Sequence, residues 1–415
     1  MTTRTRDLDV VVYGATGFVG KLVAEYLARN APADTRIGLA GRSVDRLEKT
    51  RRALGPAAAE WPLLRVDATD EASLAELAAT THVVATTVGP YAKYGLPLVR
   101  ACAEAGTDYV DLTGETPFAR ESIDRFHETA TASGARIVHS CGFDSIPSDL
   151  GVHALHRQVQ QDGAGELTDT TLVVTSMRGG VSGGTVDSLR TQIDVTKRDA
   201  ALRRLTASPY SLSPDRAAEP DLGRQADLAL ARGRDIAPEL SGWKAPFFMG
   251  PYNTRVVRRS NALTGHSYGK QFRYREVMNV GSSPVSPVLA GGVAVGMGAL
   301  VAGLAFPPTR WVLDRVLPKP GQGPGEQSRT KGHFTIDIYG RTTTGARYTV
   351  RFAAKGDPGY AATAVMFGES ALALALDRDA LPETPGGVLT PATALGDVLV
   401  GRLRDAGFEI RARRA

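Results

Sequence analysis

A glycine-rich motif near the N-terminus has the residue types and the spacing that bind the pyrophosphate of a dinucleotide. It follows an apolar run over residues 10–13 and reads Gly14-Ala15-Thr16-Gly17-Phe18-Val19-Gly20. Gly14 allows a tight turn, Gly17 lets the backbone approach the phosphates, and Gly20 allows a helix to pack closely on the strand. The N-terminus of that helix presents free N–H groups to the anion. We therefore expect all seven residues to bind a cofactor.

The end of the second predicted strand distinguishes between the two nicotinamide cofactors. An NAD site has a carboxylate about 20 residues after the glycines, but this strand ends in Ala40-Gly41-Arg42-Ser43. Arg42 offers a planar fork of donors that suits a 2′-phosphate, with Ser43 beside it. We therefore predict that the cofactor is NADP(H). Asp67, which follows the third predicted strand, either contacts the adenine or is an ordinary turn residue.

The loop after the fourth predicted strand carries the candidate proton donors. Ligands bind outside the carboxyl ends of the strands in such sheets. Four residues of this loop are therefore expected to border the nicotinamide: Thr87, Val88, Gly89 and Pro90. Three clustered side chains that follow can protonate a reduced product: Tyr91, Lys93 and Tyr94. The alternative is that these three side chains only pack against the turn.

Small and acidic residues follow the fifth and sixth predicted strands, over residues 111–115 and 141–149. Both segments reach the same edge of the sheet, where they are expected to form a substrate cleft. Helix capping by their Thr, Ser and Asp residues is the alternative. Cys141 has no evident activating histidine in the sequence, so we expect a buried, inert thiol.

These motifs need a parallel sheet to bring them to one edge, and the pattern of residues 9–140 predicts one. Short apolar runs alternate with amphipathic helices, as in a doubly wound α/β fold. The predicted strands cover residues 10–13, 36–40, 63–66, 82–88, 109–112 and 136–140, and the first helix begins near Thr16. The predicted fold class is therefore α/β, with an N-terminal Rossmann domain over residues 1–147.

A second domain of the α+β class is predicted from residue 148 onward. Its clearest element is a hairpin in which Phe334, Ile336 and Ile338 alternate with polar residues before a turn at 342–345. Alternation of this kind is typical of an antiparallel sheet with one buried face. Residues 318–325, with the sequence PKPGQGPG, read as a linker or an exposed loop.

The composition excludes several classes of protein. A net charge of +5 over 415 residues is mild, and no basic stripe with interleaved aromatic residues is visible, so we expect no nucleic-acid partner. The two cysteines form no C-x-x-C unit, so neither a metal site nor a disulfide framework is expected. With no signal peptide at the start, the predicted location is cytoplasmic.

Residues 288–306, with the sequence VLAGGVAVGMGALVAGLAF, contain no charge and come close to the length of a membrane span. A buried glycine-rich helix, a hairpin that contacts a membrane and a true span all fit this pattern. We favour peripheral contact, at the inner face of the plasma membrane. A separate basic run, Arg255, Arg258 and Arg259, is either a docking patch for an acidic carrier protein or lipid, or a solvated face.

Taken together, the motifs resemble a known family. GATGFVG, AGRS, TTVGPYAKYG, DYVDLTGE and CGFDSIPSDLG resemble the saccharopine dehydrogenase-like oxidoreductases in order and spacing. Later segments resemble the actinobacterial branch of trans-acting enoyl reductases: Ser182-Gly183-Gly184-Thr185, residues 257–263, residues 356–360 and residues 368–370. The resemblance covers nearly the whole chain.

The resemblance implies an NADPH-dependent reduction of a carbon–carbon double bond in a polyketide-type lipid, as in phthiocerol-type envelope lipid synthesis. The implied partners are a lipid or carrier-bound substrate and a polyketide synthase or acyl carrier protein. It also implies that residues 357–415 return to the Rossmann domain, so the substrate domain covers residues 148–356. An imine or amino-acid dehydrogenase and a non-catalytic, lipid-associated nucleotide-binding protein remain the alternatives. The first alternative would need arginines in the cleft for its carboxylates, and the sequence has no distinctive array of them.

Overall fold

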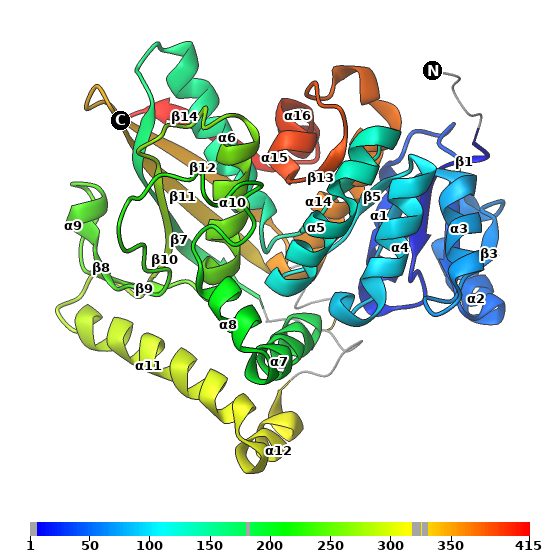
Figure 1. Ribbon diagram of the computed structural model, residues 1–415, viewed down its shortest axis with the longest axis horizontal. Helices are drawn as coiled ribbons and strands as arrows, with labels where there is room; N and C mark the ends of the chain where they lie inside the picture. The colour runs from blue at the N-terminus through cyan, green and yellow to red at the C-terminus, as the bar shows by residue number, and fades with distance from the viewer. Residues whose placement is uncertain (1–5, 180–182, 318–324, 326–330) are drawn as a thin grey trace.

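The computed structural model describes residues 6–179, 183–317, 325 and 331–415. Its architecture is two seven-stranded sheets with helices around them, and Figure 1 shows the sheets side by side. Ser182 and residues 318–324, which the sequence singled out, lie outside the described residues.

The first sheet is parallel and has the strand order β13-β6-β5-β4-β1-β2-β3, which contains the doubly wound order of a dinucleotide-binding fold. Its strands are nearly continuous apolar runs because helices cover both faces. Their bounds are β1 Leu8–Tyr13, β2 Ile37–Gly41, β3 Leu63–Arg65, β4 Thr81–Thr86, β5 Asp108–Val110, β6 Arg136–Val138 and β13 Gly387–Leu389. The predicted Rossmann sheet is confirmed. Three of its strands end two residues earlier than predicted, because the chain leaves the sheet there to form the ligand-facing loops.

Five helices of the first half connect these strands in βαβ crossovers (Figure 1). They are α1 Phe18–Asn30, α2 Val44–Leu54, α3 Glu71–Thr80, α4 Tyr91–Ala105 and α5 Thr116–Ser133, with a short 3-10 turn η1 at Pro56–Ala58. Helix α6, Ile146–Gln161, leads from β6 to the second sheet and packs on that sheet. The face of α1 that packs on the sheet consists of Gly20, Val23, Ala24 and Leu27. This spacing of three and four residues is that of a helix with one buried stripe.

The second sheet is mixed and has the strand order β14-β12-β11-β7-β10-β9-β8. Only β7 and β10 pair in parallel, and the remaining neighbours are antiparallel. The bounds are β7 Leu167–Arg178, β8 Ala231–Arg232, β9 Trp243–Pro246, β10 Arg273–Asn279, β11 His333–Thr342, β12 Arg347–Lys355 and β14 Glu409–Arg414. The predicted hairpin is β11 and β12, whose apolar residues Phe334, Ile336 and Ile338 are buried.

The helices of the second half lie around this sheet and between the two sheets. They are α7 Gly183–Arg198, α8 Ala200–Ala207, α9 Gly233–Ile236, α10 Gly250–Leu263, α11 Ser286–Ala305, α12 Pro307–Val316, α14 Thr363–Leu376, α15 Pro391–Ala394 and α16 Gly396–Asp405, with short turns η2 Pro358–Ala362 and η3 Arg378–Ala380.

The C-terminal segment contributes to both sheets. Helix α14 packs on β1, β4 and β5, and β13 pairs with β6 at the edge of the first sheet. Strand β14 instead pairs with β12 at the edge of the second sheet. The domain boundaries at residues 147 and 356 stay predictions.

The basic run in α10 is not a surface patch, which corrects the docking hypothesis. Arg255, Arg258 and Arg259 are all buried. Arg255 forms an ion pair with Asp227, and Arg258 donates to the Tyr274 carbonyl oxygen at 3.0 Å. Arg259 donates to the carbonyl oxygen of Leu212 at 2.6 Å and to that of Val388 at 2.5 Å. These arginines join α10 to neighbouring segments and are unavailable to a carrier protein.

Candidate active site

The glycine-rich loop forms a tight turn between β1 and α1. Gly14 has a φ of 91°, which favours glycine, and a Cβ atom there would lie 2.7 Å from Thr87 Oγ1. A Cβ atom on Gly20 would overlap the carbonyl oxygen of Gly14. This loop therefore has the close strand-to-helix approach that a pyrophosphate-binding turn requires, and α1 begins directly after it.

The loop after β4 lies directly against the glycine loop. The backbone N–H of Thr87 donates to the Tyr13 carbonyl oxygen at 2.9 Å, and its hydroxyl lies 3.4 Å from the Gly14 carbonyl oxygen. The structure therefore brings residues 87–90 next to residues 14–20, as a shared cofactor site requires.

At the end of β2, Arg42 is exposed and Ser43 caps α2 by accepting a bond from the Arg46 N–H at 3.4 Å. Asp67 accepts bonds from the N–H and the hydroxyl of Thr69, at 2.9 and 2.8 Å. These two bonds, with the charge of Arg42, lower the pKa of Asp67. Asp67 therefore stabilises its own turn through Oδ1, and its contact with the adenine stays a prediction.

A groove of about 160 Å³ runs between α1 and α2 beside Thr16. Its lining includes three cations and one acid: Lys21, Arg46, Lys49 and Glu25. These cations could not be recognised in the sequence, because they are spread over two helices and form no motif.

The three predicted proton donors have different environments. Tyr91 is buried, its hydroxyl lies 3.3 Å from the Thr86 carbonyl oxygen, and it accepts from the Leu112 N–H at 3.2 Å. Burial raises the pKa of Tyr91. Lys93 is exposed, with Nζ 4.9 Å from the centre of the Tyr94 ring. The geometry therefore gives Tyr91 a packing role and leaves Lys93 and Tyr94 at the surface of α4.

Glu115 is a buried carboxylate that connects three elements. It accepts bonds from the backbone N–H groups of Tyr91 and Ala92 at 3.2 and 2.8 Å, so it caps the start of α4. It also accepts a bond from the hydroxyl of Ser188 in α7 at 2.8 Å. Burial raises the pKa of Glu115, although these bonds oppose the shift.

Asp144, in the loop between β6 and α6, is a carboxylate whose surroundings suit proton transfer. It is partly buried, and its carboxylate has no hydrogen-bond partner among residues 6–179, 183–317, 325 and 331–415. Burial alone raises the pKa of Asp144 to about 6. A carboxyl group with such a pKa is partly protonated near neutral pH, as a general acid must be.

Tyr252 of α10 lies next to this loop. Its hydroxyl is 2.5 Å from the hydroxyl of Ser140, which itself donates to the Thr113 carbonyl oxygen at 2.7 Å. Because the single proton of Ser140 is used in that bond, Tyr252 is the donor in the first. Ser140 has a φ of 65°, a strained value for a residue with a side chain. Burial and nearby carboxylates, Asp144 among them, raise the pKa of Tyr252.

Ser122, His139 and Asp111 have the contacts of a hydrolase triad but not its accessibility. His139 lies 2.8 Å from the Ser122 hydroxyl and 2.7 Å from Asp111 Oδ2. All three side chains are buried, and Ser122 and Asp111 have no exposed surface. Asp111 also accepts bonds from the N–H groups of Thr113 and Ser140 at 3.0 and 2.9 Å. This network fixes the loops that follow β5 and β6, and its buried serine cannot receive a substrate carbonyl.

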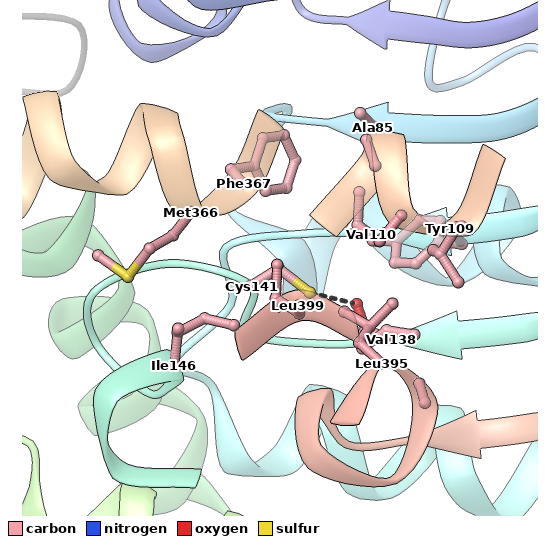
Figure 2. Packing of buried hydrophobic residues seen from close by; sticks show 14 of the residues in the cluster. Ala85, Tyr109, Val110, Val138, Cys141, Ile146, Met366, Phe367, Leu395 and Leu399 are labelled. Carbon is pink, nitrogen blue, oxygen red and sulfur yellow. Dashed lines mark hydrogen bonds between the residues drawn. The ribbon is translucent and has the colours of Figure 1, made fainter. Parts of the chain in front are cut away.

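Cys141 is buried between β6 and α14 (Figure 2). Its thiol lies 3.5 Å from the Val138 carbonyl oxygen, and the labelled neighbours in Figure 2 include Met366, Phe367 and Ile146. Burial raises the pKa of Cys141 well above its usual range. A reactive thiol needs the opposite shift, so the environment is that of an inert thiol.

Comparison with known proteins identifies the family. Residues 10–138 match the profile described as the saccharopine dehydrogenase NADP binding domain. Over its full length the chain is 55% identical to Rv2449c of Mycobacterium tuberculosis, covering 99% of that relative. Trans-acting enoyl reductases of Mycobacterium ulcerans and Mycobacterium bovis are 51% and 52% identical, over 100% and 98% of this chain and of theirs. The chain belongs to the trans-acting enoyl reductase family.

A solved structure shows the same fold at low identity. The apo saccharopine dehydrogenase (L-Glu forming) of Saccharomyces cerevisiae aligns with 98% of this chain and 99% of its own, with a TM-score of 0.54 and 14% identity. This member of the trans-acting enoyl reductase family thus shares a two-sheet α/β architecture with the yeast enzyme. The predictions of the family, of the fold and of an oxidoreductase with an NAD(P)-binding domain are confirmed.

Proposed function

We propose that this member of the trans-acting enoyl reductase family reduces a carbon–carbon double bond in a polyketide-type lipid, with NADPH as the reductant. The observation that carries the proposal is the similarity over the full length to proteins named trans-acting enoyl reductases. The substrate class we propose is the enoyl intermediate of phthiocerol-type envelope lipids, presented by a polyketide synthase or acyl carrier protein.

The glycine loop and its neighbours fit the proposed cofactor. A side chain at Gly14 would clash with Thr87, and one at Gly20 would clash with the backbone of Gly14. Both positions therefore require glycine, which supports pyrophosphate binding at residues 14–20. Arg42 is proposed to bind the 2′-phosphate with Ser43, and the groove cations Lys21, Arg46 and Lys49 add to the local positive charge. Asp67 and residues 87–90 complete the proposed site beside the adenine and the nicotinamide.

When bound, NADPH supplies the hydride for the β-carbon of the enoyl group. The chain must then supply the proton for the α-carbon, and we propose Asp144 for this role ahead of Tyr91, Lys93 and Tyr94. Asp144 has a raised pKa and an unpartnered carboxyl group among the described residues. The hydroxyl of Tyr91 is instead occupied by backbone groups.

The decisive experiment is mass spectrometry of the envelope lipids of a strain that lacks this gene. Enoyl reduction predicts accumulation of lipids with one additional double bond, and a wild-type copy should remove them. The purified protein should also oxidise NADPH in the presence of an enoyl thioester. An unchanged lipid profile, together with NADPH oxidation only in the presence of an imine or amino acid, would support the dehydrogenase alternative instead.

A further inference from the structure

Helix α11 lies on the outside of the molecule although it contains no polar stripe. Its 20 residues have a mean hydropathy of 2.1 over the most apolar window, and only 11% of that window is buried. Figure 1 shows α11 along the outer side of the second domain, with α12 at its end. By contrast, residues 358–376, the second long apolar helix in the described part of the chain, have a mean hydropathy of 1.3, are 72% buried and belong to the core.

The apolar surface of α11 extends around the helix. Val288 and Val295 are 75% and 73% exposed, and Val301 is 45% exposed. Cβ atoms added to Gly291, Gly292, Gly296 or Gly298 would meet no atom within 4 Å. An amphipathic helix would hide its apolar stripe and show a polar one, whereas a helix that is apolar all round requires an apolar environment on most sides.

Helix α12 adds residues that are typical of a membrane–water interface. Trp311 is 63% exposed, Val316 is 79% exposed, and the guanidinium group of Arg315 lies 3.0 Å from the centre of the Trp311 ring. Tryptophan and basic side chains are enriched at the level of the lipid headgroups.

The α11–α12 hairpin is attached to α7 by polar contacts. Lys197 Nζ donates to the Ala305 carbonyl oxygen at 3.0 Å, at the end of α11. Arg310 of α12 pairs with Asp194 at 2.6 Å, and Asp314 of α12 pairs with Arg190 at 2.7 Å. The start of α11 also packs on β9, where the Trp243 N–H donates to the Ser286 hydroxyl at 3.0 Å. The hairpin is therefore held at both ends of α11, while most of the apolar length of this helix remains uncovered.

Positive charge gathers in α7, α8 and α12, at the end of the hairpin that contacts α7. These helices, together with Asp199 between α7 and α8, contain seven Lys and Arg residues and four Asp residues. The two ion pairs above use two of each, which leaves five cations and two acids. The exposed cations of this group are Lys197, Arg198, Arg203, Arg204 and Arg315. An apolar helix beside exposed cations matches a bilayer surface that carries negative charge.

We propose that the α11–α12 hairpin docks this protein onto a bilayer of anionic phospholipid. In this arrangement α11 lies in the plane of the interface with its valines among the acyl chains, and Arg198, Arg204 and Arg315 face the headgroups. The inference rests on exposure and charge, so it stands independently of the proposed reaction.

Flotation of the full-length protein with liposomes tests this proposal. We expect it to float with vesicles that contain phosphatidylglycerol and to bind pure phosphatidylcholine at least about 10-fold more weakly. The triple variant Val288→Asp, Val295→Asp and Val301→Asp should lose at least about 10-fold in binding, since charge is costly at the acyl boundary. All three positions are exposed, so the fold should be retained, whereas Leu304 is buried and unsuitable as a probe.

Two controls make the result specific. The double variant Leu228→Asp and Leu376→Asp introduces acids at exposed apolar residues elsewhere, and it should float like the wild type. Trp311→Phe should remove the blue shift of tryptophan emission that vesicles induce. The proposal is overturned if the wild type ignores anionic vesicles, or if the triple variant floats equally well. It is also overturned if the wild type forms dimers that the triple variant abolishes, without binding vesicles.

Discussion

The hydroxyl of Ser188 donates a 2.8 Å hydrogen bond to Oε1 of Glu115 and thereby connects α7 to the ligand-facing edge of the first sheet. Glu115 simultaneously caps α4 through two backbone N–H groups. One buried carboxylate thus fixes both the loop that is proposed to border the nicotinamide and the helix that bears the lipid-docking hairpin.

Replacing Glu115 should destabilise the protein more than replacing its partner. Glu115→Gln removes the charge from three hydrogen bonds and should lower the free energy of unfolding by about 1.5–3 kcal/mol, the range for bonds to a charged group. Ser188→Ala leaves the α4 cap intact and should cost about 1 kcal/mol. Urea titration monitored by circular dichroism measures both values. Equal effects of the two changes would contradict the capping role of Glu115.

Arg42 should determine the choice of cofactor. We expect NADPH to bind at least about 10-fold more tightly than NADH, which corresponds to about 1.4 kcal/mol, and Arg42→Ala should remove most of this difference. Arg29→Ala makes the same change of charge at the far end of α1, where it should have no effect. Fluorescence titration with both nucleotides measures the ratio. If Arg42→Ala leaves that ratio unchanged, another group recognises the phosphate.

Asp144 should be needed in its protonated form. Because burial raises its pKa to about 6, the rate should be constant below pH 6 and fall about 10-fold per pH unit well above it. Asp144→Asn should lower turnover by about 10²-fold or more, remove this pH dependence and preserve NADPH binding. Lys93→Ala and Tyr94→Phe are the matched comparison. If one of these two variants loses activity while Asp144→Asn stays fully active, the proton donor lies in α4 instead.

Asp144→Asn should affect stability in the opposite direction from activity. The folded pKa of Asp144, about 6, exceeds the ordinary value of 3.8, so folding disfavours the carboxylate. That penalty is absent below about pH 4, grows between pH 4 and 6, and amounts to at most about 3 kcal/mol above pH 6. Asp144→Asn should therefore stabilise the protein at pH 8 and not at pH 4. Thermal unfolding of the wild type and the variant at the two pH values tests this. If Asp144→Asn shifts Tm equally at both pH values, the pKa of Asp144 is not raised by burial.

Arg259 should be a structural residue. Arg259→Ala would leave the carbonyl groups of Leu212 and Val388 without their donors, and we expect a loss of about 2–5 kcal/mol of unfolding free energy. Arg198→Ala, an exposed position, should change stability by less than about 0.5 kcal/mol. Chemical denaturation of both variants provides the comparison. A stable Arg259→Ala protein with weakened binding of an acidic partner would restore the docking hypothesis.

The parts of the site that the sequence predicted are those encoded by neighbouring residues. The glycine loop and the end of β2 each lie within a few residues of a strong apolar strand, so spacing alone positioned Gly14 and Arg42. The remaining parts depend on contacts between distant segments. Tyr252 and Ser140 are hydrogen-bonded although 112 residues separate them in the sequence, and Glu115 and Ser188 are separated by 73 residues. Arg255, Arg258 and Arg259 resembled a charged surface because nothing local in the sequence indicates that Asp227, Leu212 or Val388 will cover them.

The position of the last strands has a consequence for biosynthesis. Helix α14 covers β1, β4 and β5, and β13 and β14 complete one sheet each. During translation the chain therefore emerges with both sheets unfinished, and an apolar face of the nucleotide-binding half stays uncovered until residue 376 has been made. Such contacts between distant segments form slowly and leave an aggregation-prone intermediate. The yield of soluble recombinant protein should therefore fall more when the C-terminus is truncated, even by the six residues of β14, than when synthesis is slowed.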